Sequence, residues 1–243
     1  MSSEPEPTLR TCEVCGGTGL WTGQLVKLDK SAEYRYQQPC PAVNCPFAAD
    51  AAKRQEYARL ERAFGSAHTP TRFLKASLSD FGPEVGERVG VALAKQRGLF
   101  IQGATGVGKT HLLCAVFAVL FRGNQTAYYL PVPDWLTALR DTYQHRRSDD
   151  APTEAAMLAA ATSVDWLGLD DLGAEAITAW SRQVVFQLVN GRYLENRPII
   201  VTSNLPMNRL EAPEVYGSRV PSRLREMCDV IAVTGQDRRR GSA

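Results

Sequence analysis

One glycine-rich segment, Gly103-Ala-Thr-Gly-Val-Gly-Lys109-Thr110, restricts the folds available to this chain more than any other feature. It fits the pattern G-x-x-x-x-G-K-[ST], in which glycines allow the backbone to turn its N–H groups around phosphate oxygens. An apolar run over residues 99–102 precedes the segment, and a helical pattern follows it. A helix that starts there adds its N-terminal dipole to the site. The segment therefore predicts a nucleotide-phosphate site between a strand and a helix.

Each residue type in this loop has a predicted task. Lys109 supplies a flexible positive charge to the β- and γ-phosphates, and Thr110 supplies a hydroxyl to Mg²⁺. His111 follows as a helix residue near the nucleotide. The remaining loop residues are expected to surround the phosphates, namely Gly103, Ala104, Thr105, Gly106, Val107 and Gly108. ATP and Mg²⁺ are therefore the expected ligands.

Two further segments end in polar residues suited to the same site. The apolar run that begins at Trp166 ends in Asp170 and Asp171. A P-loop ATPase needs one acid for Mg²⁺ and another for the attacking water, and we assign Asp170 to the metal and Asp171 to the water. Asn204 follows the buried-type run 199–203 and could orient that water, although Asn-Leu-Pro is also a good turn.

Beyond Pro70, helical and strand patterns alternate along the chain. Helices are expected over 85–96, 109–121, 132–144, 153–161 and 178–196, and strands over 99–102, 126–130, 166–169, 199–203 and 230–233. This alternation predicts an α/β fold, a parallel sheet with helices on both faces. Tyr128 and Tyr129 could stack on DNA bases, but they alternate on a strand, so at least one is expected in the core.

Four of the six cysteines fall in the first 47 residues, as Cys12-x₂-Cys15 and Cys40-x₄-Cys45. Four thiolates suit tetrahedral Zn²⁺, which can hold together a segment that lacks a core. The N-terminus has no secretory pattern, and no apolar run is long enough to span a bilayer, so we expect reduced thiols in the cytoplasm. Incidental thiols or a redox pair are the alternatives. Cys114 and Cys228 are expected to be packing residues.

We therefore expect two domains. Residues 1–69 form the zinc-binding module and a linker helix over 48–64, and residues 70–243 form the nucleotide-binding core. The net charge is only +2, which argues against a broad basic surface for nucleic acid.

The order and identity of these motifs resemble the AAA+ ATPases of the DnaC/IstB family of helicase loaders and transposition helpers. The resemblance covers about residues 70–234. It rests on the phosphate loop and on Pro70-Thr-Arg-Phe, Leu169-Asp-Asp-Leu-Gly173, Asn190-x-Arg-Tyr193, Thr202-Ser-Asn-Leu205 and Ser218-Arg219-Val-Pro-Ser-Arg223-Leu224.

The resemblance implies an arginine that completes the ATP site of a neighbouring subunit. It assigns this role to Arg223, with Arg219 as helper or alternative, because Pro221 could leave Arg219 outside the helix. It also implies a core with no helical lid after the sheet, so that high-affinity ATP binding and turnover depend on a neighbouring subunit or a partner. Arg238 to Arg240 could touch phosphates, but a frayed tail is the favoured interpretation.

The resemblance further implies a function and partners. The expected function is ATP-dependent loading of a replicative DNA helicase, which the zinc module binds, onto single-stranded DNA. A transposition helper ATPase is the first alternative. A P-loop kinase of another class is the second.

Overall fold

The computed structural model describes residues 20–22, 26–29, 32–34, 37–39, 45, 48–144 and 153–238. By its contacts the chain divides into two units, Met1–Arg62 and Ala63–Ala243, a division that falls upstream of Pro70. In the first unit, β1 (Leu20–Thr22) pairs antiparallel with β4 (Gln37–Pro39), and β2 (Val26–Asp29) pairs antiparallel with β3 (Ala32–Tyr34). The helix α1 (Ala48–Ser66) follows the predicted helical pattern.

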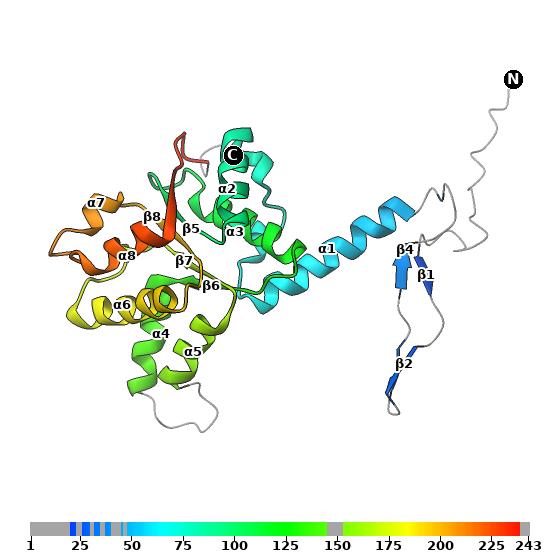
Figure 1. Ribbon diagram of the computed structural model, residues 1–243, viewed down its shortest axis with the longest axis horizontal. Helices are drawn as coiled ribbons and strands as arrows, with labels where there is room; N and C mark the ends of the chain where they lie inside the picture. The colour runs from blue at the N-terminus through cyan, green and yellow to red at the C-terminus, as the bar shows by residue number, and fades with distance from the viewer. Residues whose placement is uncertain are drawn as a thin grey trace, which may run out of the picture. The chain divides into compact units, whose positions relative to one another are not determined.

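The second unit is built on a parallel five-stranded sheet in the order β6-β7-β8-β5-β9 (Figure 1). All of its strand pairs are parallel, which confirms the predicted sheet type. The strands are β5 (Gly98–Gln102), β6 (Ala127–Pro131), β7 (Trp166–Asp170), β8 (Ile199–Ser203) and β9 (Cys228–Ala232).

The helices of this unit are α2 (Pro83–Ala94), α3 (Lys109–Arg122), α4 (Val132–Gln144), α5 (Glu154–Ser163), α6 (Ala179–Leu194), α7 (Met207–Leu210) and α8 (Arg219–Met227), with short 3₁₀ turns η1 (Thr71–Phe73) and η2 (Leu78–Phe81). The five helices that the sequence predicted in this unit, α2 to α6, are confirmed, whereas α7 and α8 had no predicted range. The hydroxyl of Thr153 accepts from the N–H of Ala156 and so caps α5. Within the described stretch that ends at residue 238, no helix follows β9.

The expectation that Pro221 leaves Arg219 outside the last helix is wrong. Arg219 is the first residue of α8, and Pro221 lies in its first turn. Proline is tolerated there because the first-turn N–H groups have no partner within the helix.

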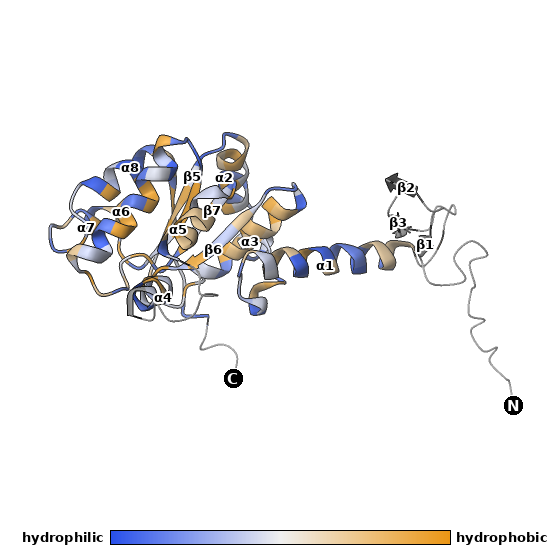
Figure 2. Cartoon of the chain, turned by 90° about the horizontal axis from the view of Figure 1, so that it is seen from below, coloured by the Kyte–Doolittle hydropathy of each residue, from blue (hydrophilic) through white to orange (hydrophobic). Residues whose placement is uncertain are grey.

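Side-chain alternation along the strands gives the sheet two covered faces. Leu167 and Leu169 of β7 belong to the apolar cluster that contains residues of α4, α5, α6 and α8. Gly168 between them faces the other way, and a Cβ placed on it would meet Phe117 and Leu113 of α3. Figure 2 shows hydrophobic residues of the strands, in orange, between the helices. Even-numbered β7 residues, including Asp170, therefore share the α3 side of the sheet.

Among the described residues, no helix combines the length and apolar character that crossing a membrane requires.

Candidate functional site

The glycine-rich segment connects the end of β5 to the start of α3, as predicted. Gly106 and Gly108 have φ values of 84° and 105°, a backbone region that residues with a Cβ rarely adopt. A Cβ on Gly106 would also overlap the carboxylate of Asp237. The loop conformation thus requires both glycines, and Asp237 leaves no room for a Cβ on Gly106.

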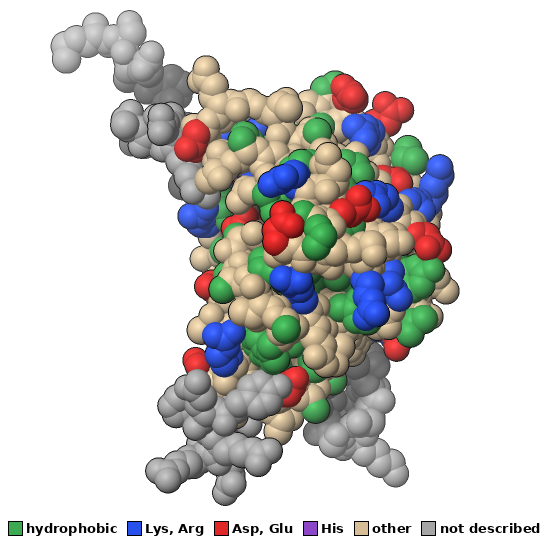
Figure 3. All heavy atoms as spheres, turned by 90° about the vertical axis from the view of Figure 1, so that its left-hand side faces the viewer, with side chains coloured by type: hydrophobic (Ala, Val, Ile, Leu, Met, Phe, Trp, Pro, Cys, Tyr) green, Lys and Arg blue, Asp and Glu red, His purple; other side chains and the backbone are tan. Residues whose placement is uncertain are grey.

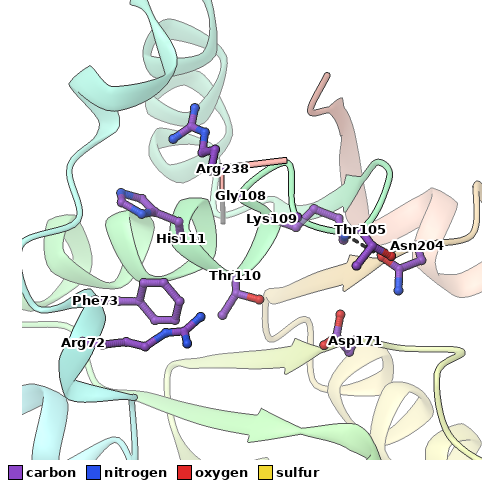
Figure 4. A pocket seen from close by; sticks show the side chains of 11 residues that line it. Arg72, Phe73, Thr105, Gly108, Lys109, Thr110, His111, Asp171, Asn204 and Arg238 are labelled. Atoms are coloured by element: carbon purple, nitrogen blue, oxygen red, sulfur yellow. Dashed lines mark hydrogen bonds between the residues drawn. The ribbon is translucent and has the colours of Figure 1, made fainter. Parts of the chain in front are cut away.

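The loop borders a cavity of about 490 Å³ (Figure 4). Its lining includes eight residues predicted from the sequence, namely Thr105, Gly106, Gly108, Lys109, Thr110, His111, Asp171 and Asn204. The other three predicted loop residues, Gly103, Ala104 and Val107, line a separate hollow of about 530 Å³ beside β9. The site that the motifs indicated is therefore assembled from β5, β7, β8 and α3.

Lys109 connects the phosphate loop to the end of β8. Its side chain is buried, and its Nζ donates to the carbonyl of Ala104 at 2.9 Å and to Oδ1 of Asn204 at 2.6 Å (Figure 4). A buried ammonium group requires such partners. The predicted lysine and the predicted polar amide thus meet directly.

Asp170 accepts hydrogen bonds from three hydroxyl groups and is 3% exposed. Thr110 Oγ1 lies 3.1 and 3.0 Å from its two carboxylate oxygens. Thr202 Oγ1 donates to Oδ1 at 2.6 Å, and Tyr129 Oη donates to Oδ2 at 2.6 Å. Burial raises the pKa of Tyr129, so its hydroxyl keeps the proton that it donates.

The donor set of Thr110 and Asp170 fits magnesium. A hydroxyl and a carboxylate are hard oxygen ligands, and here they lie in hydrogen-bond contact beside the phosphate loop. The sequence did not indicate the two other hydroxyls on Asp170, because Thr202 and Tyr129 lie on different strands.

Asp171 lies in a strained turn at the end of β7. Its φ is 58°, and its N–H donates to Thr202 Oγ1 at 2.8 Å. A non-glycine residue held in this region commonly marks a functional site. The turn places Asp171 in the lining of the cavity that also contains Asn204.

Aromatic and basic residues form the opposite side of the cavity. His111 Nε2 lies 2.7 Å from Oδ2 of Asp80, and the rings of Phe73 and Phe81 pack edge-on against the imidazole. The Arg72 guanidinium lies over the Phe73 ring at 4.4 Å. Sequence reasoning assigned no site role to Arg72 or Phe73, although both lie in the segment Pro70-Thr-Arg-Phe.

The interpretation of Arg238 as part of a frayed tail is wrong. Its N–H donates to the carbonyl of Gly106 at 3.0 Å, and its guanidinium lies 4.5 Å from the centre of the Phe81 ring. Arg238 therefore lines the cavity. No local sequence pattern indicates this contact, because it forms between segments that lie far apart in the chain.

Arg219 and Arg223 lie on α8, and neither lines the cavity of its own chain. Arg223 Nε donates to Oδ1 of Asn190 at 2.7 Å, and its guanidinium lies over the rings of Phe186 and Tyr193. Figure 3, viewed from the side of α6, α7 and α8, shows Lys and Arg side chains interspersed with hydrophobic ones. The predicted arginines thus belong to an outer face.

The predicted cysteine site lies largely outside the described residues. Of its four members only Cys45 is described, and it is half-buried. Among the described residues, no group of three or more His, Cys, Asp or Glu side chains could hold a metal ion. Cys114 and Cys228 are buried, and desolvation raises the pKa of both thiols, which agrees with a packing role.

Comparison with known proteins identifies relatives of this core. Residues 91–242 match the family model described as IstB-like ATP binding protein. The replicative helicase loader DnaI of Bacillus subtilis (strain 168) is 29% identical over 156 residues, which is 60% of this chain and 48% of DnaI. The insertion sequence ATP-binding protein y4uH of Sinorhizobium fredii is 28% identical over 151 residues, 61% of this chain and 58% of that protein. The matched region thus spans about half the length of these curated relatives.

A solved structure supports the fold assignment. The crystal structure of the DnaC helicase loader superimposes with a TM-score of 0.57 and 23% identity, covering 68% of this chain and 100% of that chain. The five-stranded parallel sheet with its phosphate loop therefore has the same fold as that protein.

Proposed function

The chain belongs to the family of IstB-like ATP-binding proteins, which are AAA+ ATPases, and we propose that it uses ATP to load a replicative DNA helicase onto single-stranded DNA. The observation that carries this proposal is the meeting of Lys109, Asp171 and Asn204 in one cavity, in a chain similar to the DnaI loader. Family membership argues against the alternative of a P-loop kinase of another class.

ATP is expected to bind with its phosphates along the glycine-rich loop. Lys109 would neutralise phosphate charge, and Thr110 and Asp170 would hold Mg²⁺, which would supply further charge neutralisation. Asp171 polarises the attacking water, and Asn204 orients it. The half-buried position of Asp171 in the cavity lining is compatible with that task.

Arg223 acts on the ATP site of a neighbouring subunit in this proposal. Its guanidinium stands away from its own cavity, while Asn190 and two aromatic rings hold it in place on α8. A preorganised guanidinium stabilises charge on the transferring phosphoryl group without reorganising at the moment of reaction. Arg219, one turn earlier on α8, is the helper or alternative.

We further propose that residues 1–69 form a zinc-dependent module that contacts the helicase. The chemistry of the donor set carries this step, since Cys12, Cys15, Cys40 and Cys45 offer the four thiolates that structural zinc prefers. Metal analysis of the purified full chain should give about one zinc per chain. Cys12→Ser should lower that value, whereas Cys114→Ser, at a buried packing position in α3, should not.

A transposition helper is the second candidate, favoured by the family name and by the similarity to y4uH. In that case the same ATPase core would act with a transposase on target DNA. The ATP-site chemistry is the same in both candidates, so only the partner distinguishes them.

The deciding experiment is retention of partners by the full tagged chain with ATP and Mg²⁺. We expect it to retain the hexameric replicative helicase of the encoding organism and to place it on circular single-stranded DNA. Cys12→Ser should lose the helicase, and Cys114→Ser should keep it. Retention of a transposase and duplex DNA, with no helicase, would contradict the loader function and support the helper.

A further inference from the structure

Tyr129 occupies an unusual place for a large side chain on an edge strand. It lies on β6, at one edge of the sheet, yet it is only 7% exposed. Its hydroxyl reaches Oδ2 of Asp170 at 2.6 Å. A hydrogen bond of this length to a carboxylate is among the stronger kinds that proteins form.

Strand register explains how the two side chains meet. Tyr129 pairs with Gly168, and Pro131 pairs with Asp170, so Tyr129 and Asp170 lie one pleat apart on the same face of the sheet. Gly168 has no side chain to intervene between them. The phenol therefore spans the gap that the glycine leaves and ends at the carboxylate.

The three hydroxyls on Asp170 differ in their expected roles. Thr110 is itself a predicted magnesium ligand, so its bond to the carboxylate belongs to the metal site. Thr202 and Tyr129 are not predicted ligands, and they donate to different oxygens of the carboxylate, Oδ1 and Oδ2. Two donors on opposite oxygens fix the rotation of the carboxylate plane.

The backbone of Tyr129 is itself held from outside the sheet. Its N–H donates at 2.8 Å to the carbonyl of Ala67, a buried residue just after α1. The exposed His68 packs its ring edge-on against Tyr128, with the ring centres 5.2 Å apart. Ala67 thus holds the backbone of Tyr129 from the outer side of β6.

We propose that Tyr129 is a positioning residue for magnesium, which orients the carboxylate of Asp170 through its hydroxyl. This inference rests on the proposed ATP–Mg²⁺ site and adds a residue that none of the motifs contains. Groups that orient a metal ligand in this way typically change metal affinity by about 10- to 100-fold when they are removed.

The test is Tyr129→Phe in the full chain, which removes one oxygen and keeps the ring volume. Binding of a fluorescent ATP analogue is titrated with Mg²⁺. We expect the Mg²⁺ concentration at half-maximal binding to rise about tenfold, with the affinity at saturating Mg²⁺ restored to that of the wild type. Analogue binding in EDTA should be unchanged.

Tyr128→Phe is the matched control, because it makes the same chemical change at a neighbouring residue that contacts His68 instead. Its Mg²⁺ midpoint should equal that of the wild type. Thr202→Val removes the other orienting hydroxyl and should shift the midpoint in the same direction as Tyr129→Phe. Thr202→Ser, which keeps the hydroxyl, should restore it.

An unchanged midpoint in Tyr129→Phe, with or without a lower Tm, would overturn the positioning role. Absence of Mg²⁺-dependent analogue binding in the wild type would instead overturn the ATP–Mg²⁺ site itself. The two failures are therefore distinguishable.

Discussion

Polar side chains gather in two regions of the molecule, at the carboxyl ends of the strands around Asp170 and on the outer face around Arg223. The two regions differ in the hydrogen-bond partners that these side chains find. Around Asp170, the hydroxyls of Thr110, Tyr129 and Thr202 bind one buried carboxylate within a single chain. On α8, Arg223 is held by Asn190 and by ring faces, outside the cavity of its own chain. The first region holds its polar groups on one another beside the cavity, whereas the second, in our proposal, acts on the ATP site of another copy.

Removing the lysine of the first region should have the largest effect. In Lys109→Ala the cavity loses its buried ammonium, and we expect the Kd for ATP to rise about 100-fold, because a charged hydrogen bond contributes up to ~3 kcal/mol. ATP turnover should be lost with it. Fluorescent-nucleotide binding measures the Kd, and Lys95→Ala, at an exposed position after α2, is the control expected to match the wild type.

Removing the arginine of the second region should separate binding from turnover. Arg223→Ala should lower kcat about 100-fold, because one preorganised donor to the transition state is lost. Its Kd for ATP should stay at the wild-type value. Arg225→Ala is the matched control on the same helix, since Arg225 pairs with Glu211 on the surface. Equal loss of turnover in both variants would contradict a specific role for Arg223.

Removing one contact that holds Arg223 should lower kcat less than removing Arg223 itself. Asn190→Ala removes the acceptor of the 2.7 Å bond from Arg223 Nε but leaves the guanidinium on its aromatic rings. We expect kcat to fall about tenfold, which corresponds to ~1.5 kcal/mol for one charged hydrogen bond. Steady-state turnover at saturating ATP checks this. A decrease as large as that of Arg223→Ala would mean that the rings do not hold the side chain.

A change outside both regions should alter stability alone. Asp165 accepts from the N–H and the hydroxyl of Thr126, and these bonds hold the pKa of its carboxyl below the usual value. The stabilisation is therefore present at neutral pH and is lost as the pH falls below about 3.8, through the lowered pKa. Asp165→Asn should lower Tm slightly at pH 7, and the difference from the wild type should shrink as the pH falls through the lowered pKa of Asp165. Its ATP turnover at 25 °C should not change.

The parts of the site that follow from local pattern could be predicted from the sequence. The phosphate loop, Asp170, Asp171 and Asn204 each stand at the end of an apolar strand, and parallel strands bring their carboxyl ends to one edge. What this reasoning missed depends on register and on distant contacts. Tyr129 reaches Asp170 only because it pairs with Gly168 of β7. The residues of a single strand do not reveal which strand it pairs with or in which register.

The segment Asn190-x-Arg-Tyr193 shows the same limit within one motif. Asn190 and Tyr193 contact Arg223, whereas Arg192 between them is fully buried. Its guanidinium donates to backbone carbonyls, among them those of Asp165 and Pro198, and burial lowers its pKa to about 10. The three residues belong to one motif, but the packing shows that Asn190 and Tyr193 hold Arg223 whereas Arg192 holds the backbone of the core.

The central claim, that each ATP site is completed by an arginine from another copy, is tested most directly by mixing two inactive variants. Lys109→Ala binds ATP weakly and cannot turn it over, but it supplies Arg223. Arg223→Ala binds ATP but lacks the arginine. The account predicts that the mixture hydrolyses ATP well above either variant alone, with a maximum near equal amounts. No gain in activity at any ratio, in mixtures shown by size to contain both chains in one assembly, would contradict it.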